Sequence, residues 1–443
     1  MALKVCKFGG TSMADGHTMT KVKNIIRADS DRLYVVVSAP GKRFSGDTKI
    51  TDLLYGCYEQ LKTTGSCRQA FAEIEKRFTG IVKELGLDFD IRGVLSATLE
   101  RMEREKSEDF CASRGEYLSA VVMAHLLDAK FVDGEDVVFF DENGAFDDKK
   151  SYAAIASAVS GGGLCVFPGF YGRGADGKIK TFSRGGSDIT GAIVARAVGA
   201  SVYENWTDVS GFLACDPRIV DSPKRIKTLS YKELRELSYM GANVLHAESI
   251  FPVRKANIPI VIKNTFRPED EGTSILPIAQ YKPGGNIVTG IAGKKNFTVL
   301  FIEKSHMNSE VGFVRKVLSV FERFNISVEH IPSGIDTMSV VVEGSCMDNF
   351  RLEQILECIK AEVEPDFMRV SENIALVATV GHGMSSSVGT SARLFKALAD
   401  AGVNIKMIDQ GSSELNIIVG VKDEDMERSI AAIYREFFGS DRV

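Results

Sequence analysis

A repeat in the last third of the chain constrains the fold more than any other feature. The segment GFVRKVLSVFERFNISVEHI, which starts at Gly312, aligns without a gap with GTSARLFKALADAGVNIKMI, which starts at Gly389, at an offset of 77 residues. The same offset places SVVVEG (339–344) on NIIVGV (416–421). Each copy reads as strand, helix, strand, strand, helix and a final strand. The repeat therefore predicts two copies of one α+β module.

The repeat also predicts domain boundaries. We expect a first domain over residues 1–293 and a regulatory region over 294–443, with repeats at about 297–370 and 371–443. An exchange of strands between the two repeats stays open. Neither copy contains a catalytic constellation, so we expect these modules to sense a ligand or to pair with another chain.

Strand-like and helical segments alternate in the first domain. LKVCKF and RLYVVVSAP read as buried strands, and the stretch 16–28 between them has a helical period. Its apolar face carries Met19, Val22, Ile25 and Ile26. Residues 51–127 are mostly helical, and alternation then resumes as far as PIVIKNTF. This order predicts an α/β fold, a mostly parallel sheet between helices, with ligands at the carboxyl ends of the strands.

Composition excludes several classes of protein. A formal net charge of −5 argues against a nucleic-acid partner and against a basic membrane-binding patch. No apolar run reaches the length of about 18 residues that a membrane span needs, and MALKVCKFGG turns polar too soon for a signal peptide. The 8 cysteines form no CxxC pair and no metal-like spacing with histidine. We therefore expect reduced, mostly buried thiols and a cytoplasmic location.

KFGGTS (7–12) is the first junction between a strand and a helix. Two adjacent glycines allow backbone N–H groups to face an anion at a helix N-terminus, and Lys7 adds a positive charge. A phosphate site is the favoured interpretation for Lys7, Gly9 and Gly10. Thr11 or Ser12 could instead be a helix N-cap. The stretch is no Walker P-loop, because GxxxxGK[ST] does not occur in the chain.

TFSRGGSD (181–188) is a second junction of the same kind. Arg184 suits a planar carboxylate or phosphate partner, and Asp188 begins a helical stretch. An N-cap aspartate on an ordinary turn is the alternative. GRGADG (172–177) matches GxGxxG, but it lies between two strand-like runs and has Asp-Gly at its tip. We therefore predict a hairpin turn there.

Two further stretches carry charges at expected helix or strand ends. SRGE (113–116) is expected to open the helix RGEYLSAVVMAHLL, where Glu116 could receive a substrate ammonium group or could merely cap a solvated end. WTDVSGFLACDPR (206–218) holds an aspartate and an arginine around a turn and could equally be a plain surface loop.

Taken together, these stretches and GANVLH (241–246) resemble the aspartate kinases of the amino-acid kinase superfamily, in the order found there. The C-terminal repeat resembles their paired ACT regulatory domains, so that the resemblance covers essentially the whole chain. It implies transfer of the γ-phosphoryl group of ATP to the side-chain carboxylate of L-aspartate, which gives 4-phospho-L-aspartate. This reaction is the first step of lysine, threonine and methionine biosynthesis.

The resemblance also implies residue roles. Lys7 would contact the phosphoryl oxygens, Gly9 and Gly10 would allow close backbone approach, and Asp188 would orient Lys7 and keep it protonated. Arg184 would bind the substrate α-carboxylate and Glu116 its α-ammonium group. Thr51 and Ser187 would complete that pocket, unless Thr51 only caps the helix TDLLYGCYEQL. An aspartate side chain is ionised at neutral pH, so the nucleophile needs no general base.

For the nucleotide, the resemblance points to Thr207, Asp208, Leu213 and Arg218, with Mg²⁺ held largely by phosphates and water and no dedicated protein metal site. Two positions depart from the family pattern. Asn243 stands where many relatives have a lysine that reaches the phosphates, and Leu213 replaces a frequent tyrosine. We expect Asn243 to contribute a hydrogen bond without charge.

The first repeat resembles the effector site of lysine-sensitive enzymes, which predicts feedback inhibition, with L-lysine as the expected effector. Backbone groups of Gly312, Phe313 and Val314 would bind it, next to Met307 and across from Ser327, Val328 and Glu329. Glu329 could pair with a second amino group or could be a solvated strand residue. ACT modules bind amino acids where two of them meet, so we expect a homodimer, or a dimer of dimers.

Three other interpretations are distinguishable from this one. A kinase for glutamate or N-acetylglutamate is distinguished by substrate profiling. A non-catalytic amino-acid sensor would have lost the charged set, yet Lys7, Glu116, Arg184 and Asp188 are all present. A bifunctional kinase–dehydrogenase is not expected, because the two repeats occupy the residues after 293.

Overall fold

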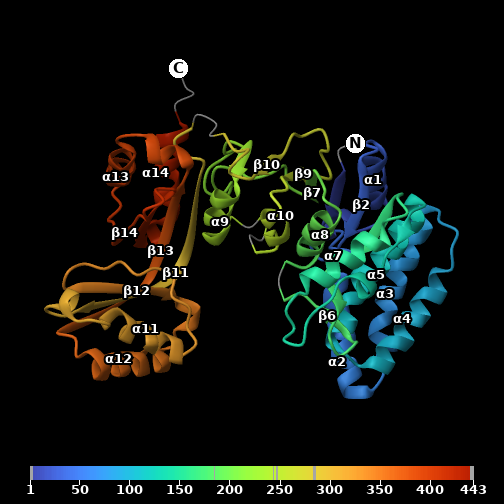
Figure 1. The fold of residues 1–443 in the computed structure, drawn as a ribbon, viewed down its shortest axis with the longest axis horizontal. Helices are drawn as coiled ribbons and strands as arrows, with labels where there is room; N and C mark the ends of the chain where they lie inside the picture. Colours follow the sequence, from blue (N-terminus) through green and yellow to red (C-terminus); the bar gives the residue numbers. More distant parts are fainter. Residues whose placement is uncertain (1–2, 184, 243, 246–247, 283–285, 440–443) are drawn as a thin grey trace. The chain divides into compact units, whose positions relative to one another are not determined.

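The computed structural model describes residues 3–183, 185–242, 244–245, 248–282 and 286–439. The chain forms two compact units. The first comprises Met1–Phe212, Lys227–Tyr231 and Asn243–Lys282, and the second comprises Leu213–Ile226, Lys232–Ala242 and Pro283–Val443. Figure 1 shows the elements of both units along the chain.

The first unit is built on an eight-stranded sheet with the order β3-β4-β2-β1-β7-β9-β10-β8. Neighbouring strands are parallel except for the antiparallel pair β9 and β10. The strands are β1 (Lys4–Phe8), β2 (Arg32–Val37), β3 (Lys130–Phe131), β4 (Cys165–Pro168), β7 (Val202–Thr207), β8 (Thr228–Ser230), β9 (Ile260–Asn264) and β10 (Thr273–Leu276). The predicted α/β class with a mostly parallel sheet is confirmed.

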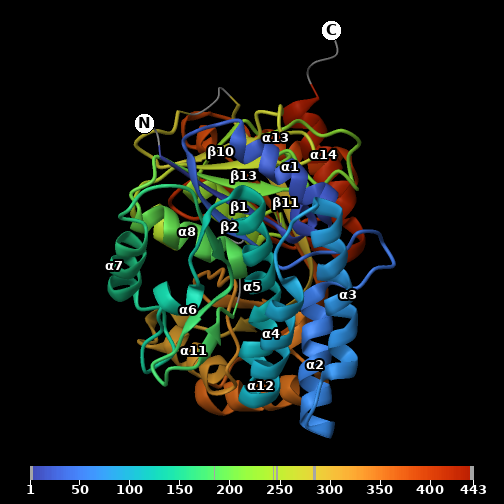
Figure 2. The same ribbon diagram turned by 90° about the vertical axis from the view of Figure 1, so that its right-hand side faces the viewer.

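The helices of this unit pack on the sheet or on one another. They are α1 (Gly16–Arg27), α2 (Ile50–Thr64), α3 (Arg68–Leu85), α4 (Ile91–Glu105), α5 (Glu108–Leu127), α6 (Gly134–Val137), α7 (Asp148–Ala158), α8 (Gly186–Ala197) and α10 (Phe251–Lys255), with a 3₁₀ turn η1 (Gly10–Met13) after β1. The four predicted apolar residues of α1 are all buried. Figure 2 shows α2, α3 and α4 side by side, and their apolar faces join β1, β2 and α1 in one core.

Two local predictions have different outcomes. GRGADG lies between β5 (Tyr171–Arg173) and β6 (Ile179–Thr181), which pair antiparallel, so the predicted hairpin is confirmed. The prediction that SRGE opens a helix is wrong. Helix α5 begins at Glu108, with Ser107 as its N-cap, because EDFCA continues the helix toward the N-terminus. Glu116 therefore lies inside α5 and not at its end.

The second unit contains a five-stranded antiparallel sheet with the order β12-β11-β13-β15-β14. Its strands are β11 (Gly290–Glu303), β12 (Thr337–Glu343), β13 (Phe367–Val380), β14 (Met407–Asp409) and β15 (Asn416–Lys422). Its helices are α9 (Tyr231–Tyr239), whose first residue belongs to the first unit, α11 (Phe313–Arg323), α12 (Asn349–Val363), α13 (Thr390–Asp400) and α14 (Met426–Phe438). Short 3₁₀ turns are η2 (Met307–Ser309), η3 (Gly344–Cys346), η4 (His382–Ser386) and η5 (Asp423–Asp425).

The repeat seen in the sequence is visible in this sheet. Gly312 and Gly389 both stand at the N-cap of a helix with a φ of 87°, a conformation that glycine adopts without strain. The long strands β11 and β13 run through both halves. The end of β11 pairs with β12 and with the start of β13, whereas its start, Gly290–Lys294, pairs with Val380–Leu376 at the end of β13. The two halves of the sheet therefore share two continuous strands.

Part of the sequence before residue 293 also packs in the second unit. Ile291 donates its backbone N–H to the carbonyl of Ala214 at 2.7 Å, and the Asn416 side-chain amide donates to Glu236 of α9 at 2.6 Å. The segments 213–226 and 232–242 are thus built into the unit that contains the repeats.

The thiols agree with the prediction from composition. All 8 cysteines are free, and Cys346 and Cys358 are the two that are not fully buried. Within the described residues, no helix combines the length and the apolar character that crossing a bilayer requires.

Candidate active site

Lys7 lies at the carboxyl end of the central strand β1. In the sheet register it faces Asn205 of β7, and its side chain extends toward the first turn of α8. There its Nζ atom lies 2.6 Å from Oδ1 of Asp188. Lys7 is 8% exposed. An ammonium group that is buried beside a carboxylate is held in a fixed position.

Asp188 is held from a second side. The side-chain amide of Asn205 donates to Asp188 Oδ1 at 2.9 Å, and the hydroxyl of Tyr203 donates to the Asp188 carbonyl at 3.1 Å. Helix α8 has Gly185 as its N-cap, so the alternative that Asp188 caps this helix is wrong. Asn205 was not among the predicted residues, although its position in the strand VYENWT places it on the same face as Lys7 through the register.

Gly9 and Gly10 bring two backbones together. A Cβ atom on Gly10 would lie 3.0 Å from the carbonyl oxygen of Ala39, and the N–H of Gly41 donates to the Gly10 carbonyl at 2.8 Å. The loop after β1 therefore lies directly against the loop after β2. A Cβ on Gly9 would point toward Lys7 Nζ at 3.6 Å, and the Gly9 N–H already donates to the carbonyl of Trp206 at 3.0 Å.

Thr11 and Ser12 link this loop to two other strand ends. Thr11 donates to the carboxylate of Asp208, just after β7, at 3.2 Å, and the Ser12 hydroxyl lies 2.8 Å from that of Thr265, just after β9. The N-cap of α1 is Asp15, so the alternative that Thr11 or Ser12 caps this helix is wrong. The carboxyl ends of β1, β7 and β9 thus meet, as expected for a parallel sheet.

A pocket of about 530 Å³ opens beside the glycine loop. It is lined by Gly10 and Thr11, by residues of the loop 38–49, and by Thr51 and Glu116. Thr51 is the second residue of α2, whose N-cap is Lys49, so the alternative that Thr51 caps this helix is wrong. The pocket brings together three of the residues predicted for phosphate or substrate.

Glu116 is the buried carboxyl group of this pocket. Burial raises its pKa to about 8, against the opposing effect of the Ala39 backbone N–H. Within the described part of the chain, its Oε2 atom has no hydrogen-bond partner. A carboxyl group that is buried, unpaired on one oxygen and directed into a pocket is suited to bind a cation from a ligand.

The remaining predicted substrate residues lie near α8. Ser187 is buried in its first turn, and a Cβ on Gly169, just after β4, would clash with the Ser187 hydroxyl at 2.4 Å. Ser187 therefore packs closely against the end of β4. Arg184 lies outside the described residues, as does Asn243.

The predicted nucleotide residues divide between the two units. Thr207 ends β7, and its hydroxyl donates to Asp208 at 3.2 Å in the first unit. Leu213 and Arg218 belong to the second unit. Leu213 forms an isolated bridge with Arg225, and Arg218 makes an ion pair with Asp216 at 2.6 Å.

The predicted effector residues all belong to the first repeat. Met307 and the ring of Phe313 are buried in its core, whereas Val314 on α11 is partly exposed. Ser327, Val328 and Glu329 follow that helix, and the Glu329 N–H donates to the carbonyl of Val341 at 2.8 Å. Burial, followed by the charge of Glu343, raises the pKa of Glu329. Glu329 is therefore a partly desolvated carboxyl group rather than a fully solvated one.

Comparisons with known proteins identify the family. Residues 2–264 match the model of the amino acid kinase family, and residues 377–437 match an ACT domain. Aspartokinase 3 of Bacillus subtilis (strain 168) is 39% identical over 450 residues, which cover 98% of this chain and 99% of that protein. The crystal structure of Clostridium acetobutylicum aspartate kinase is 50% identical with a TM-score of 0.90, and the match covers 99% of this chain and 100% of that one.

Two crystal structures of Escherichia coli aspartokinase III are also similar, each at 27% identity and over all of that chain. One is a complex with aspartate and ADP (R-state), with a TM-score of 0.78 over 98% of this chain. The other is a complex with lysine and aspartate (T-state), with a TM-score of 0.75 over 99% of this chain. The resemblance predicted from the motifs is confirmed: this chain belongs to the aspartokinases of the amino acid kinase family.

Proposed function

We propose that this chain transfers the γ-phosphoryl group of ATP to the side-chain carboxylate of L-aspartate. The observation that carries the proposal is the contact of the buried Lys7 with Asp188, 2.6 Å apart, at the end of β1 and next to the loop that lines the Glu116 pocket. A carboxylate oxygen of aspartate attacks the γ-phosphorus and forms the new P–O bond. The bond from that phosphorus to the β,γ-bridging oxygen breaks, and ADP leaves with the electron pair.

The residues act by position and charge. Aspartate is already ionised, so no general base has to remove a proton. Lys7 would neutralise charge on the transferred group, where such a donor has its largest effect on rate. Asp188 and Asn205 would keep the Lys7 amine in place. Gly9 and Gly10 would let the phosphates approach the backbone.

The substrate would lie in the 530 Å³ pocket. Glu116 would bind its α-ammonium group, Arg184 its α-carboxylate, and Thr51 and Ser187 would complete the contacts. Thr207, Asp208, Leu213, Arg218 and Asn243 would serve the nucleotide. Within the described residues, no group of three or more His, Cys, Asp or Glu side chains could hold a metal ion. Mg²⁺ would keep phosphate oxygens and water as most of its ligands.

We also propose that L-lysine inhibits the enzyme through the first repeat. The E. coli aspartokinase III complex with lysine supports this, as does the partly desolvated Glu329 beside Ser327 and Val328. The effector must bind an inactive arrangement more tightly than the active one. Activity in millimolar lysine, threonine and both tests the claim, and no response to any of them would contradict it.

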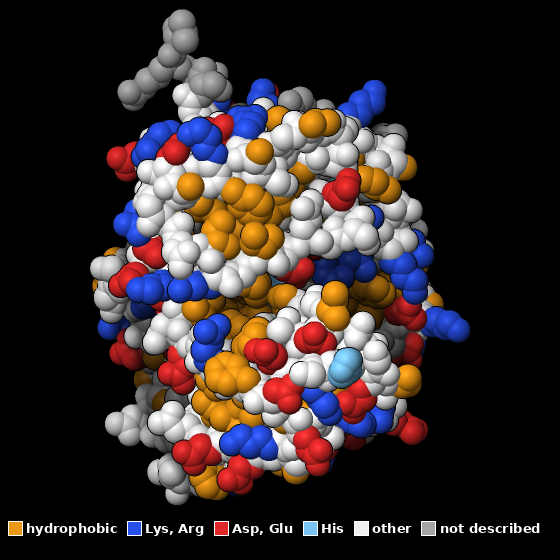
Figure 3. Space-filling model, turned by 90° about the vertical axis from the view of Figure 1, so that its left-hand side faces the viewer, with side chains coloured by type: hydrophobic (Ala, Val, Ile, Leu, Met, Phe, Trp, Pro, Cys, Tyr) orange, Lys and Arg blue, Asp and Glu red, His pale blue; other side chains and the backbone are white. Residues whose placement is uncertain are grey.

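A homodimer through the repeats, or a dimer of dimers, is the assembly that we propose. Val311 is 97% exposed, and Ile331, Ile335 and Val314 of the same repeat are also exposed. Figure 3 shows apolar patches on the face that carries the C-terminal repeats. We likewise propose domain boundaries at 293/294 and 370/371, which fall inside β11 and β13.

The test is consumption of ATP by the purified chain with Mg²⁺ and L-aspartate, followed by trapping of the acyl phosphate with hydroxylamine. Glutamate and N-acetylglutamate are tested separately as alternative substrates. ADP release with aspartate alone among the three supports the proposal. No turnover with aspartate would contradict it.

A further inference from the structure

Arg77 is a buried cation that the proposed mechanism does not use. It lies on α3 and is 7% exposed. Burial of a guanidinium group is costly unless its N–H groups are paired. Its partners therefore indicate what it holds together.

Those partners come from two loops at the strand ends. Arg77 Nη1 donates to the carboxylate of Asp47 at 2.8 Å, and Nη2 donates to the carbonyl of Gly41 at 2.6 Å. Nη2 and Nε also donate to the carbonyl of Ala14 at 3.0 and 3.3 Å. Ala14 belongs to the loop after β1, and Gly41 and Asp47 belong to the loop after β2. One side chain thus joins the two loops to α3.

The same two loops form the substrate pocket. Gly10 and Thr11 come from the first, and Lys42, Phe44 and Lys49 come from the second. The second loop, residues 38–49, has no helix or strand of its own. It is held to the first loop by the Gly41–Gly10 hydrogen bond and by Arg77, which contacts both loops. Arg77 itself does not line the pocket, so it can influence a ligand only through these loops.

We propose that Arg77 is a positioning residue that sets the shape of the amino-acid pocket by fixing the loop 38–49 against the loop after β1. This inference rests on the proposed function. A planar guanidinium group donates to all three acceptors at once, whereas a lysine amine at this position would reach fewer of them. A displacement of about 1 Å in a binding site can reduce the rate by about 100-fold. Loosening of the loop 38–49 should therefore change the kinetic constants by a measurable amount.

The experiment measures kcat and both KM values for Arg77→Met and Arg77→Lys. We expect the KM for aspartate to rise about tenfold or more in both variants, with a change of at most about twofold in the KM for ATP. Arg77→Lys keeps the charge, so a high aspartate KM in this variant shows that the fork geometry matters. Hydrogen exchange of residues 38–49 should become faster in both variants.

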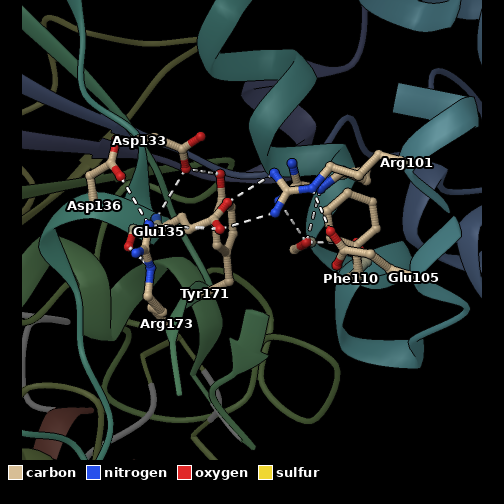
Figure 4. Close-up of polar contacts among 10 residues, drawn as sticks. Arg101, Glu105, Phe110, Asp133, Glu135, Asp136, Tyr171 and Arg173 are labelled. Carbon is tan, nitrogen blue, oxygen red and sulfur yellow. Dashed lines mark hydrogen bonds and ion pairs between the residues drawn. The ribbon is translucent and has the colours of Figure 1, made fainter. Parts of the chain in front are cut away.

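Arg101 provides a matched control. Like Arg77, it is an arginine on a helix of the first unit. It pairs with the carboxylates of Glu105 at 2.5 Å and Glu135 at 2.9 Å, whereas Arg77 pairs with one carboxylate, that of Asp47. Figure 4 shows this network, which extends from Glu135 to Arg173 and lies beside the Tyr171–Asp133 hydrogen bond. None of these residues lines the pocket. Arg101→Met should lower the stability of the enzyme but leave the aspartate KM unchanged.

The outcomes separate the claims. A normal aspartate KM in Arg77→Lys and Arg77→Met, or an equal rise in Arg101→Met, would overturn the role of Arg77. If Arg77→Met does not fold, Arg77→Lys and the exchange of residues 38–49 decide. Failure of the wild-type enzyme to phosphorylate aspartate would instead overturn the proposed function.

Discussion

Two cations that we assign to ATP, Lys7 for the transferred phosphoryl group and Arg218 for the nucleotide, differ in how they are held. Lys7, in the first unit, is buried, pairs with Asp188 and is braced through that carboxylate by Asn205. Arg218, in the second unit, has a side chain that is 89% exposed and pairs with Asp216, two residues earlier. The position of Lys7 is fixed when the chain folds, whereas an exposed arginine must lose side-chain freedom when a ligand binds. This difference predicts that removal of the Lys7 side chain lowers activity more than removal of the Arg218 side chain.

Lys7→Ala should have the largest effect. The transferred group would lose a positioned positive charge in a buried site, and kcat should fall at least about 100-fold. Single-turnover measurements with L-aspartate and ATP test this, with circular dichroism to establish that the variant is folded. Turnover close to that of the wild type would show that Lys7 has a different role.

Glu116 should give the next largest effect, through pH. Its pKa of about 8 means that the free enzyme holds this carboxyl group protonated at neutral pH. An ammonium group binds the ionised form, so kcat/KM for aspartate should rise up to about tenfold per pH unit and level off above about pH 8. Glu116→Gln should abolish this slope and lower kcat/KM at high pH about 30-fold. An unchanged slope in the variant would assign the titration to another group.

The same carboxyl group should affect stability. The folded state retains a proton that the unfolded chain, with an ordinary pKa of 4.5, has released. Between about pH 4.5 and pH 8, Glu116 should therefore lower the free energy of unfolding as the pH rises. Denaturant titrations of wild type and Glu116→Gln at several pH values test this, and the variant should lose that part of the decline. Parallel curves would contradict the buried, protonated state.

Asn205→Ala sharpens the comparison, because it removes the brace but leaves Lys7. Loss of one hydrogen bond to a charged group costs about 1.5 kcal/mol, so kcat should fall about tenfold. Both KM values should stay near those of the wild type, since Asn205 does not line the pocket. A change confined to KM would mean that Asn205 does not act through Asp188.

Arg218→Ala should give the smallest effect. An exposed side chain with an adjacent carboxylate contributes little to affinity, and the KM for ATP should rise no more than about fivefold, with a smaller rise at high salt. Initial rates at two salt concentrations test this. If the KM for ATP rose by a factor as large as the fall of kcat in Lys7→Ala, Arg218 would have to become ordered when the nucleotide binds. The contrast between a fixed Lys7 and a mobile Arg218 would then be wrong.

The sequence predicts residues that belong to a motif better than residues that support one. Lys7, Asp188 and Glu116 stand in recognisable stretches, and the structure places the first two together and the third in the adjacent pocket. Asn205 and Arg77 have no motif of their own. Their roles depend on strand register and on contacts between segments far apart in the chain, which no local pattern encodes.

Local capping patterns were the least reliable signals. Thr11, Ser12, Thr51 and Asp188 all precede or begin apolar helical periods, yet none of them caps its helix. The N-caps are Asp15, Lys49 and Gly185 instead. No local pattern predicts that residues 213–226 pack in the second unit. This packing depends on a hydrogen bond between Ala214 and Ile291 of β11.

The shared strands of the C-terminal sheet bear on how this protein is made. The start of β11 pairs with the end of β13. During synthesis, the start of β11 leaves the ribosome long before the end of β13 has been made. Until then its edge is open, and chaperones or a neighbouring nascent chain can occupy it. Neither repeat can be excised as an autonomous fragment, because a cut between them would strip each half of a strand. Gene truncations in this region should therefore yield insoluble products rather than unregulated kinases.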